Sequence, residues 1–374
     1  MKIAMISGEF PPMPGGVGDF ARILSECLRV AGHDVSILSR AGTSSETLPV
    51  STVDGWGLKG LRQIRAWLRR IKPDIVNLQF QTAAYDMSPY IHFLPHLVDR
   101  PVVTTFHDLR FPYLFPKAGP LRNWIVMQLA RASAGVITTN HEDHLRLKAM
   151  PKRRLIPIGS SIKRRTLDAQ ERAALRERLG ATRSTFLLGH FGFVKAIKGV
   201  DWLIDALART RRGGADIRLV FIGGRSNTVD ADGDEQYLQG LDERIRRLGL
   251  ANAVQWTGFL PEAEIAACFN AIDLMVLPFA DGASYRRSSL IAAIHQGCAV
   301  LTSEPTVAVD SFSHGRNLWL VPPRSAESIQ IALAHLMTNR EQLETLRGGA
   351  LKLSKHFDWD EVTQATADFY QACL

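Results

Sequence analysis

Short apolar runs recur through the first half of the chain, separated by segments of helical period. We expect five buried strands there, at residues 2–7, 35–38, 75–79, 102–106 and 135–139. Apolar side chains recur at helical spacing over residues 20–31 and again over 58–71, and Gly32 follows the first of these helices where glycine is favoured. Strands that alternate with helices predict βαβ units and a parallel sheet.

The second half repeats this alternation. We expect strands at residues 185–191, 217–222, 254–257, 274–277 and 299–302, and helices at residues 198–209, 235–248, 262–271, 288–296, 326–338 and 361–373. The pattern therefore predicts an α/β protein of two Rossmann-like domains, each a doubly wound parallel sheet. Ligands bind such sheets outside the carboxyl ends of the strands, so two sheets that face each other would form a deep central cleft.

A polar, charged stretch near residues 158–185 marks the expected domain boundary. We place the first domain at residues 1–165 and the second at 166–357, and we expect a C-terminal helix at about 358–374 to pack back onto the first domain. Hydrophobic residues make up 46% of the 374 residues and charged residues 22%, which is typical of globular proteins. No apolar run reaches the roughly 18 residues of a membrane-spanning helix, and the short apolar start reads as a strand, so we expect a cytoplasmic protein.

The net charge of +8 is unevenly distributed along the sequence. Residues 1–165 hold 23 Lys and Arg against 12 Asp and Glu, whereas residues 166–374 hold 22 against 25. A basic first half suits an anionic membrane, a phosphorylated lipid or an acidic polymer. No nucleic-acid motif accompanies the charge, so we do not expect nucleic acid as a partner.

Residues 58–72 concentrate this charge on one predicted helix, and Lys152-Arg153-Arg154 and Lys163-Arg164-Arg165 add to it. Its apolar stripe consists of Leu61, Ile64, Trp67, Leu68 and Ile71. Two interpretations stay open. The helix could attach the protein peripherally to the inner face of an anionic membrane, or its stripe could pack on the sheet of its own domain.

Two candidate sites lie at strand ends of the first domain. Gly15 and Gly16 precede a helix, so the backbone could approach a ligand closely and the helix N-terminus could offer free N–H groups to an anion. A tight turn is the alternative, and the spacing is not that of a dinucleotide-binding fingerprint. His107 and Asp108 follow an apolar run, where a histidine could orient a sugar hydroxyl or move a proton. A structural His–Asp pair is the alternative.

Two further candidates lie at strand ends of the second domain. Lys198 enters a helix, where its charge opposes the helix dipole, so a bound phosphate would relieve it. The loop after the strand at 274–277 combines small residues, hydroxyls and arginine before the next helix, which suits a diphosphate. Its candidate ligands are Gly282, Ala283, Ser284, Arg286, Ser288 and Ser289. A solvated basic loop and an ordinary serine-capped helix are the alternatives.

The ordered set of motifs resembles the retaining GT-B glycosyltransferases of glycosyltransferase family 4 along essentially the whole chain. The matching segments are residues 11–18, Thr105-Phe106-His107-Asp108, residues 192–199, Phe221-Ile222-Gly223-Gly224, Trp256-Thr257-Gly258-Phe259-Leu260, residues 272–278 and residues 290–300. The resemblance implies an acceptor domain followed by a nucleotide-sugar domain, with retention of configuration and neither a bound metal nor another cofactor. It implies that Gly16 lies near the donor phosphates and His107 near the transferred sugar. Lys198 would then lie on the diphosphate and Gly258, Phe259 and Leu260 beside the base.

The chain departs from this family at two places. Ser284 and Ala292 stand where relatives have two glutamates, of which the first usually contacts the donor sugar and the second the ribose. Phe193 stands where relatives often have arginine, and Arg286 or Arg287 could supply that charge instead. The main hypothesis is a transferase that uses a nucleotide diphosphate sugar and a glycan, lipid-linked or small-molecule acceptor. A catalytically silent nucleotide-binding scaffold and a sugar-nucleotide epimerase-like enzyme are the alternatives.

Overall fold

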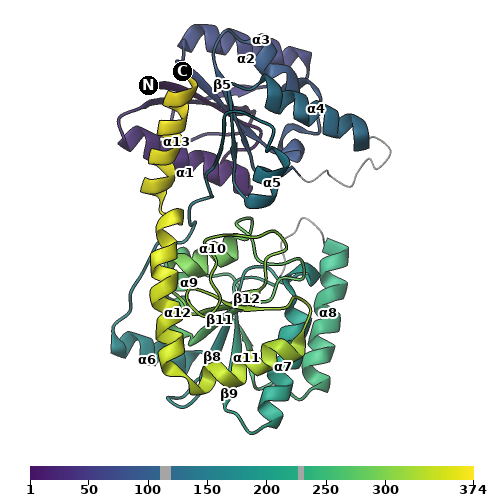
Figure 1. Ribbon diagram of the computed structural model, residues 1–374, viewed down its shortest axis with the longest axis vertical. Helices are drawn as coiled ribbons and strands as arrows, with labels where there is room; N and C mark the ends of the chain where they lie inside the picture. The colour runs from purple at the N-terminus through teal and green to yellow at the C-terminus, as the bar shows by residue number, and fades with distance from the viewer. Residues whose placement is uncertain (110–118, 226–230) are drawn as a thin grey trace. The chain divides into compact units, whose positions relative to one another are not determined.

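The computed structural model describes residues 1–109, 119–225 and 231–374, and it divides the chain into two compact units (Figure 1). The first unit comprises Met1–Gly159 together with Trp359–Leu374, and the second comprises Ser160–Asp358. The division falls before Lys163-Arg164-Arg165, which the sequence analysis placed in the first domain. The C-terminal helix belongs to the first unit.

A seven-stranded parallel sheet forms the first unit, in the order β3-β2-β1-β4-β5-β6-β7. Its strands are β1 (Lys2–Ser7), β2 (Asp34–Arg40), β3 (Val50–Val53), β4 (Ile75–Phe80), β5 (Val102–Phe106), β6 (Gly135–Thr138) and β7 (Arg153–Leu155). The strand order reverses between β1 and β4, which pair in register from Ile3 with Ile75 to Ser7 with Gln79. This reversal is the point at which doubly wound sheets bind ligands.

Helices cover both faces of the first sheet. They are α1 (Gly16–Val30), α2 (Leu58–Ile71), α3 (Leu94–Leu97), α4 (Gly119–Ala132), α5 (His141–Arg146) and α13 (Trp359–Cys373), with single 3₁₀ turns at η1 (Thr82–Tyr85) and η2 (Tyr90–Phe93). One core layer joins α1 and α13 to the sheet, and Figure 1 shows these two helices side by side. The other layer contains the buried face of α2 and parts of α3 and α4.

The apolar stripe of α2 packs on the sheet of its own unit. Leu61, Ile64, Trp67 and Leu68 are buried in the core layer, so this stripe is not available for insertion into a bilayer. Of the two interpretations of this helix, the structure therefore supports packing of the apolar side chains on the sheet of their own domain. Across residues 1–109, 119–225 and 231–374, no helix is long and apolar enough to cross a membrane.

The second unit repeats the architecture with six parallel strands in the order β10-β9-β8-β11-β12-β13. Its strands are β8 (Phe186–Phe191), β9 (Ile217–Ile222), β10 (Val254–Trp256), β11 (Leu274–Leu277), β12 (Val300–Ser303) and β13 (Trp319–Val321). Its helices are α6 (Ala169–Arg178), α7 (Val200–Arg212), α8 (Ala231–Arg247), α9 (Glu262–Ala271), α10 (Ser288–His295), α11 (Ala326–Thr338) and α12 (Arg340–Leu353), with 3₁₀ turns at η4 (Ala196–Lys198) and η5 (Ser354–Phe357). The order reverses between β8 and β11.

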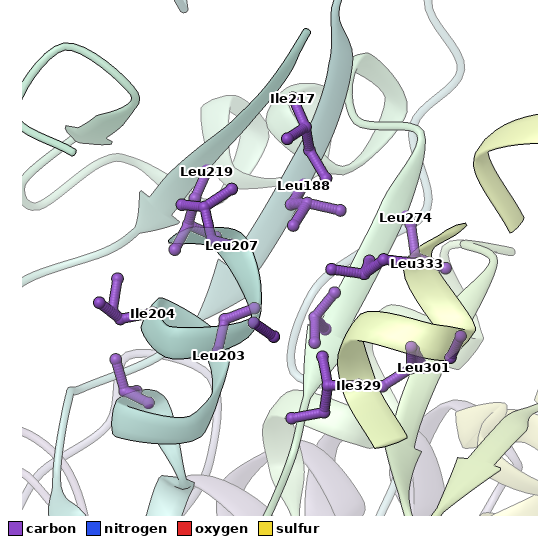
Figure 2. Close-up of a cluster of buried hydrophobic side chains, with 14 of the residues drawn as sticks. Leu188, Leu203, Ile204, Leu207, Ile217, Leu219, Leu274, Leu301, Ile329 and Leu333 are labelled. Carbon is purple, nitrogen blue, oxygen red and sulfur yellow. The ribbon is translucent and has the colours of Figure 1, made fainter. Parts of the chain in front are cut away.

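Leucine and isoleucine side chains join the helices to this sheet. Figure 2 shows Leu203, Ile204 and Leu207 on α7 beside the strand residues Leu188 and Leu219, with Ile329 and Leu333 of α11 packed beside them. All of these side chains are at most 1% exposed. Burial of a side chain of this size stabilises the fold by about 1.5–3 kcal/mol, so this layer fixes the positions of the strand ends.

Several elements were absent from the sequence expectation. They are β3, α3, α4, α5, β7, α6, β13 and α12. Four of these have no more than four residues, too short for periodicity to be recognised. The start of α6 did carry a signal, because Asp168 and Glu171 form a capping box in which each side chain accepts from the other's backbone N–H.

The compact units differ from the predicted domains in their charge. The first unit holds 20 Lys and Arg against 15 Asp and Glu, and the second holds 25 against 22. The two units therefore differ little in net charge. Lys163, Arg164 and Arg165 belong to the second unit, and the three acidic residues of α13 belong to the first.

Candidate active site

The loops that follow β8 and β11 meet at the reversal point of the second sheet. The N–H of Ala280 donates to the carbonyl of Ile197 at 3.0 Å and ties the two loops together. Gly199 has a φ of +71°, and a Cβ on it would lie 1.9 Å from the carbonyl oxygen of Pro278. Only glycine permits this approach, which brings the neighbouring Lys198 against the segment before α10.

Lys198 lies in a crowded, cationic environment. Its Nζ donates to the Oγ of Ser289 at 3.3 Å and lies 5.2 Å from the centre of the Phe279 ring. The guanidinium of Arg287 lies over the same ring at 4.7 Å and forms an ion pair with Asp281. Burial and then the charge of Arg287 lower the pKa of Lys198 to about 8, while Asp281 opposes this shift. A bound anion would relieve this repulsion.

The N-terminus of α10 opens beside Lys198. The helix begins at Ser288, and Arg287 occupies the cap position without a side-chain hydrogen bond to the first turn. Ser289 is buried, whereas Ser288 is exposed. The first amides of the helix, the helix dipole, Lys198 and Arg287 together have the composition of a phosphate site. The sequence analysis named Arg287 only as an alternative to Arg286 for a missing charge and not among the candidate ligands of the loop, although its place directly before the helix was a usable signal.

The other residues predicted in this loop shape it. Gly282 has a φ of +86°, and a Cβ there would lie 2.7 Å from the carbonyl oxygen of Glu304. Ala283 is 2% exposed, and its N–H donates to the carbonyl of Ser303 at 3.3 Å. The carbonyl of Ser284 accepts from the N–H of Arg287 at 3.1 Å, which makes a turn before the helix. Arg286 is half-buried in that turn.

An exposed aromatic surface lies at the ends of β9 and β10. Phe259 is 75% exposed, packs on Gly224 and meets Phe193 edge to face at 6.0 Å between ring centres. Gly258 has a φ of +71° and forms an isolated bridge with Gly223. Leu260 follows, half-buried. Phe193, at the family's usual arginine position, thus supplies a ring instead of a charge.

In the first unit, a side chain already occupies part of the predicted anion cradle. The Oε1 of Glu9 accepts from the N–H groups of Val17 at 2.9 Å and Gly18 at 3.2 Å. A Cβ on Gly15 would lie 2.3 Å from Glu9 Oε1, whereas a Cβ on Gly16 would meet nothing within 4 Å. The prediction of free N–H groups at this helix start is wrong for two of them, because a carboxylate accepts from both.

His107 lies at the end of β5 and is held from several sides. Its Nε2 lies 2.7 Å from the Oε1 of Gln79, and its ring meets Phe20 edge to face at 5.0 Å between ring centres. Burial lowers the pKa of His107 to about 4, so the ring is neutral near pH 7. A base of such low pKa is poorly matched to proton transfer at neutral pH, which favours an orienting role. The Nε2 partner is Gln79, not Asp108, which follows half-buried in the loop.

Comparison with known families decides the class of protein. Residues 14–159 match the family described as Glycosyltransferase Family 4. Residues 185–339 match the family described as Glycosyl transferases group 1. The two matches span most of the chain, and one falls in each compact unit. The chain is a glycosyltransferase.

Relatives and solved structures agree with this assignment. A glycogen synthase of Mycobacterium tuberculosis is 26% identical over 423 aligned positions, which cover 100% of this chain and 95% of the relative. A phosphatidyl-myo-inositol mannosyltransferase of Mycobacterium leprae is 23% identical, with coverages of 99% and 96%. The structure of Anabaena Alr3699/HepE in complex with UDP is 20% identical with a TM-score of 0.81, and both chains are covered completely. The GT-B fold expected from the sequence is thereby confirmed.

This glycosyltransferase buries one of its two atypical positions. Ala292 is 0% exposed in the interior of α10, where it packs within the core, and Ser284 is half-buried in the preceding turn. Neither side chain carries a charge. The cations and the helix N-terminus of the site are therefore present without the two carboxylates that the resemblance led us to look for.

Proposed function

We propose that this glycosyltransferase moves a sugar from a nucleotide diphosphate sugar to an acceptor hydroxyl, with retention of anomeric configuration and without a metal ion. The observation that carries the proposal is the cluster of Lys198, Ser289 and Arg287 at the open N-terminus of α10. It unites the groups that bind a diphosphate: two cations, a hydroxyl and free backbone amides.

The cluster suits the charge that develops during transfer. The bond between the anomeric carbon and the diphosphate oxygen breaks, and negative charge grows on the leaving diphosphate. The acceptor oxygen bonds to the same carbon and its proton is released. Preorganised positive charge near the leaving group stabilises this change, and removal of a single such donor commonly costs 10²–10³ in rate, or about 2.7–4 kcal/mol. Lys198 and Arg287 take the role that a metal ion has elsewhere.

The exposed aromatic surface supports a place for the nucleotide. We assign Gly258, Phe259 and Leu260 to the base, because Phe259 offers a solvent-facing ring at the same edge of the sheet. Solved structures of Alr3699/HepE contain UDP and UDP-glucose. A uracil nucleotide is therefore the first donor to test.

The relatives' names suggest the range of acceptors. They name glycogen, D-inositol 3-phosphate and phosphatidyl-myo-inositol. We assign acceptor binding to the first domain and propose a glycan, lipid-linked or small-molecule hydroxyl as the acceptor.

Calorimetric titration with UDP, GDP and ADP tests the donor site. We expect one nucleotide to bind equally well with and without EDTA. Lys198→Ala should weaken that binding about tenfold to a hundredfold, because a charged hydrogen bond contributes about 1.5–3 kcal/mol. Lys352→Ala, an exposed lysine on α12, is the matched control and should change nothing. Loss of binding in EDTA would refute metal independence, and unchanged affinity in Lys198→Ala would refute the phosphate site.

Transfer itself distinguishes an enzyme from a silent scaffold. With the nucleotide sugar that binds, we expect release of nucleotide diphosphate and, with a mixture of acceptors, a glycoside whose anomeric proton shows the configuration of the donor. Tight nucleotide binding without hydrolysis or transfer would favour the scaffold. A product of inverted configuration would refute retention.

We also propose peripheral contact with anionic lipid headgroups at the other end of the first sheet. Four exposed cations line a pocket of about 570 Å³: Arg65, Arg69 and Lys72 at the end of α2, and Arg100 before β5. Asp99 is the one acid in its lining. Each surface cation near an anionic bilayer contributes about 1 kcal/mol.

Vesicle sedimentation tests this contact. The protein should bind vesicles that contain phosphatidylglycerol and not pure phosphatidylcholine. Arg65→Glu with Arg69→Glu should abolish binding, whereas the charge-matched control of Arg246→Glu with Arg247→Glu on α8 should retain it. Equal loss in both double variants would show a nonspecific charge effect and refute the assignment.

A further inference from the structure

Two amide side chains lie inside the first sheet. Asn77 and Gln79 are both 0% exposed on β4, a strand whose other four side chains are apolar. They point to the same face, because residues two apart in a strand do so. Burial of an amide side chain costs free energy unless its N–H and C=O groups are hydrogen-bonded. The hydrogen-bond partners of Asn77 and Gln79 therefore identify the groups that these two side chains position.

The hydrogen bonds of this pair run in one direction. The carbonyl oxygen of Val103 can only accept, so the group of Asn77 that lies 3.0 Å from it is the Nδ2 donor. The same Nδ2 lies 3.0 Å from Thr105 Oγ1. Asn77 therefore turns its oxygen to Gln79, whose Nε2 donates to it.

The donor and acceptor groups of Gln79 in turn fix those of His107. Because the nitrogen of the Gln79 amide faces Asn77, its Oε1 faces His107 Nε2 at 2.7 Å. An amide oxygen only accepts, so Nε2 must carry the proton. The ring is neutral, since burial lowers its pKa to about 4, and no charged side chain among the described residues contributes to that shift. Nδ1 is then left with a lone pair.

The rest of the surroundings keeps the ring in this orientation. Phe20 packs edge to face against it at an angle of 75°, and the N–H of His107 donates to the carbonyl of Phe80 at 3.1 Å. Nδ1 has no hydrogen-bond partner among the described residues, and the side chain is only half-buried. A fixed acceptor therefore remains at the carboxyl end of β5, the edge where doubly wound sheets bind ligands.

We propose that Asn77 and Gln79 are positioning residues that hold His107 in its Nε2–H tautomer, so that Nδ1 accepts a hydrogen bond from a hydroxyl of the sugar. The role toward a sugar rests on the function proposed above; the tautomer does not. A neutral acceptor selects an O–H donor and rejects a phosphate or carboxylate, which have only acceptor oxygens at neutral pH. We call the hydrogen-bonded series Asn77, Gln79 and His107 the relay. The relay thus excludes donor sugars with an anionic group at this contact.

Nitrogen NMR of histidine-labelled protein tests the tautomer without any substrate. His107→Gln identifies the signals. We expect a pyrrole-type Nε2 and a pyridine-type Nδ1 in the wild type, unchanged from pH 5.5 to 8. The opposite pattern, or a rapid average of the two, would overturn the proposal even if the protein transfers sugar normally.

Two variants then connect the relay to catalysis. Gln79→Leu should average the two nitrogen signals and lower kcat/KM at least tenfold, with nucleotide affinity unchanged. Gln79→Glu should keep Nε2–H and raise the pKa of His107. Protonation of Nδ1 should then lower the activity of this variant, and the activity should return as pH rises. Gln371→Leu, at an exposed position on α13, is the control. Unaltered nitrogen signals and kinetics in Gln79→Leu would overturn the relay, and a normal relay in a protein without transferase activity would overturn only the proposed function.

Discussion

At the scale of single residues, the site depends on groups whose charge the fold has altered. Lys198 has a pKa of about 8, because it is buried and Arg287 lies near it over the Phe279 ring. His107 has a pKa of about 4, because burial disfavours its cation. One group is thus half-charged just above neutral pH and the other uncharged, which suits one to an anion and the other to a hydroxyl.

The lowered pKa of Lys198 predicts a pH dependence of nucleotide binding. Its charge is complete well below pH 8 and is lost as pH rises through that value, so nucleotide diphosphate affinity should fall from pH 7 to pH 9. Near pH 8 a bound diphosphate should raise the pKa of the lysine and cause proton uptake, which calorimetry in buffers of different ionisation enthalpy measures. Lys198→Ala should bind weakly and remove most of this slope. A slope that persists in Lys198→Ala would assign the titration to another group.

At the scale of elements, loops at strand ends decide what each helix N-terminus can bind. The start of α10 has no side-chain cap and Lys198 contacts the Oγ of Ser289 in its first turn, whereas two amides of α1 are satisfied by Glu9. The two loops thus lead to an open helix start in one unit and to a partly filled one in the other. The difference lies in a single carboxylate located six residues before Gly15.

Glu9 should therefore be a stabilising cap of α1. Glu9→Ala should lower the free energy of unfolding by about 0.5–2 kcal/mol, since loss of a cap costs that amount. Glu9→Gln keeps an acceptor oxygen and should lose only the charge–dipole part, about 0.3–1 kcal/mol. Urea unfolding measures both, with Glu46→Ala at an exposed position as the control. Equal stability of wild type and Glu9→Ala would show that the cap contributes nothing.

At the scale of the whole molecule, the two units differ in continuity. The second is one stretch of chain with its own core, Ser160–Asp358. The first is completed by α13, whose Val362, Phe369, Tyr370 and Cys373 are buried in its core layer. Close packing is evident at Gly135, where an added Cβ would lie 2.5 Å from the sulfur of Cys373.

This difference predicts how fragments behave. Residues 160–358 should fold alone with a single cooperative thermal transition. Residues 1–159 should lack cooperative unfolding because the core layer that α13 shares with α1 loses part of its cover, and a peptide of residues 359–374 added in trans should restore the transition. Within the full chain, Phe369→Ala should cost about 3–5 kcal/mol, and exposed Gln371→Ala almost nothing. Cooperative melting of 1–159 alone would refute the dependence on α13.

The sequence by itself determined the fold class and the positions of the glycine- and cation-bearing loops, because apolar runs alternating with helical stripes leave few arrangements other than doubly wound sheets. Lys198 and the segment before α10 were predictable as a pair for the same reason: both follow strands at the carboxyl edge. Only the tertiary structure decided which groups meet there. It brought Arg287 over Phe279, filled the amides beside Gly15 with Glu9, and turned Gln79 toward His107. It also joined Lys198 to Ser289, which lie 91 positions apart in the sequence. Side-chain packing and hydrogen-bond direction decide these contacts, and no local pattern encodes either.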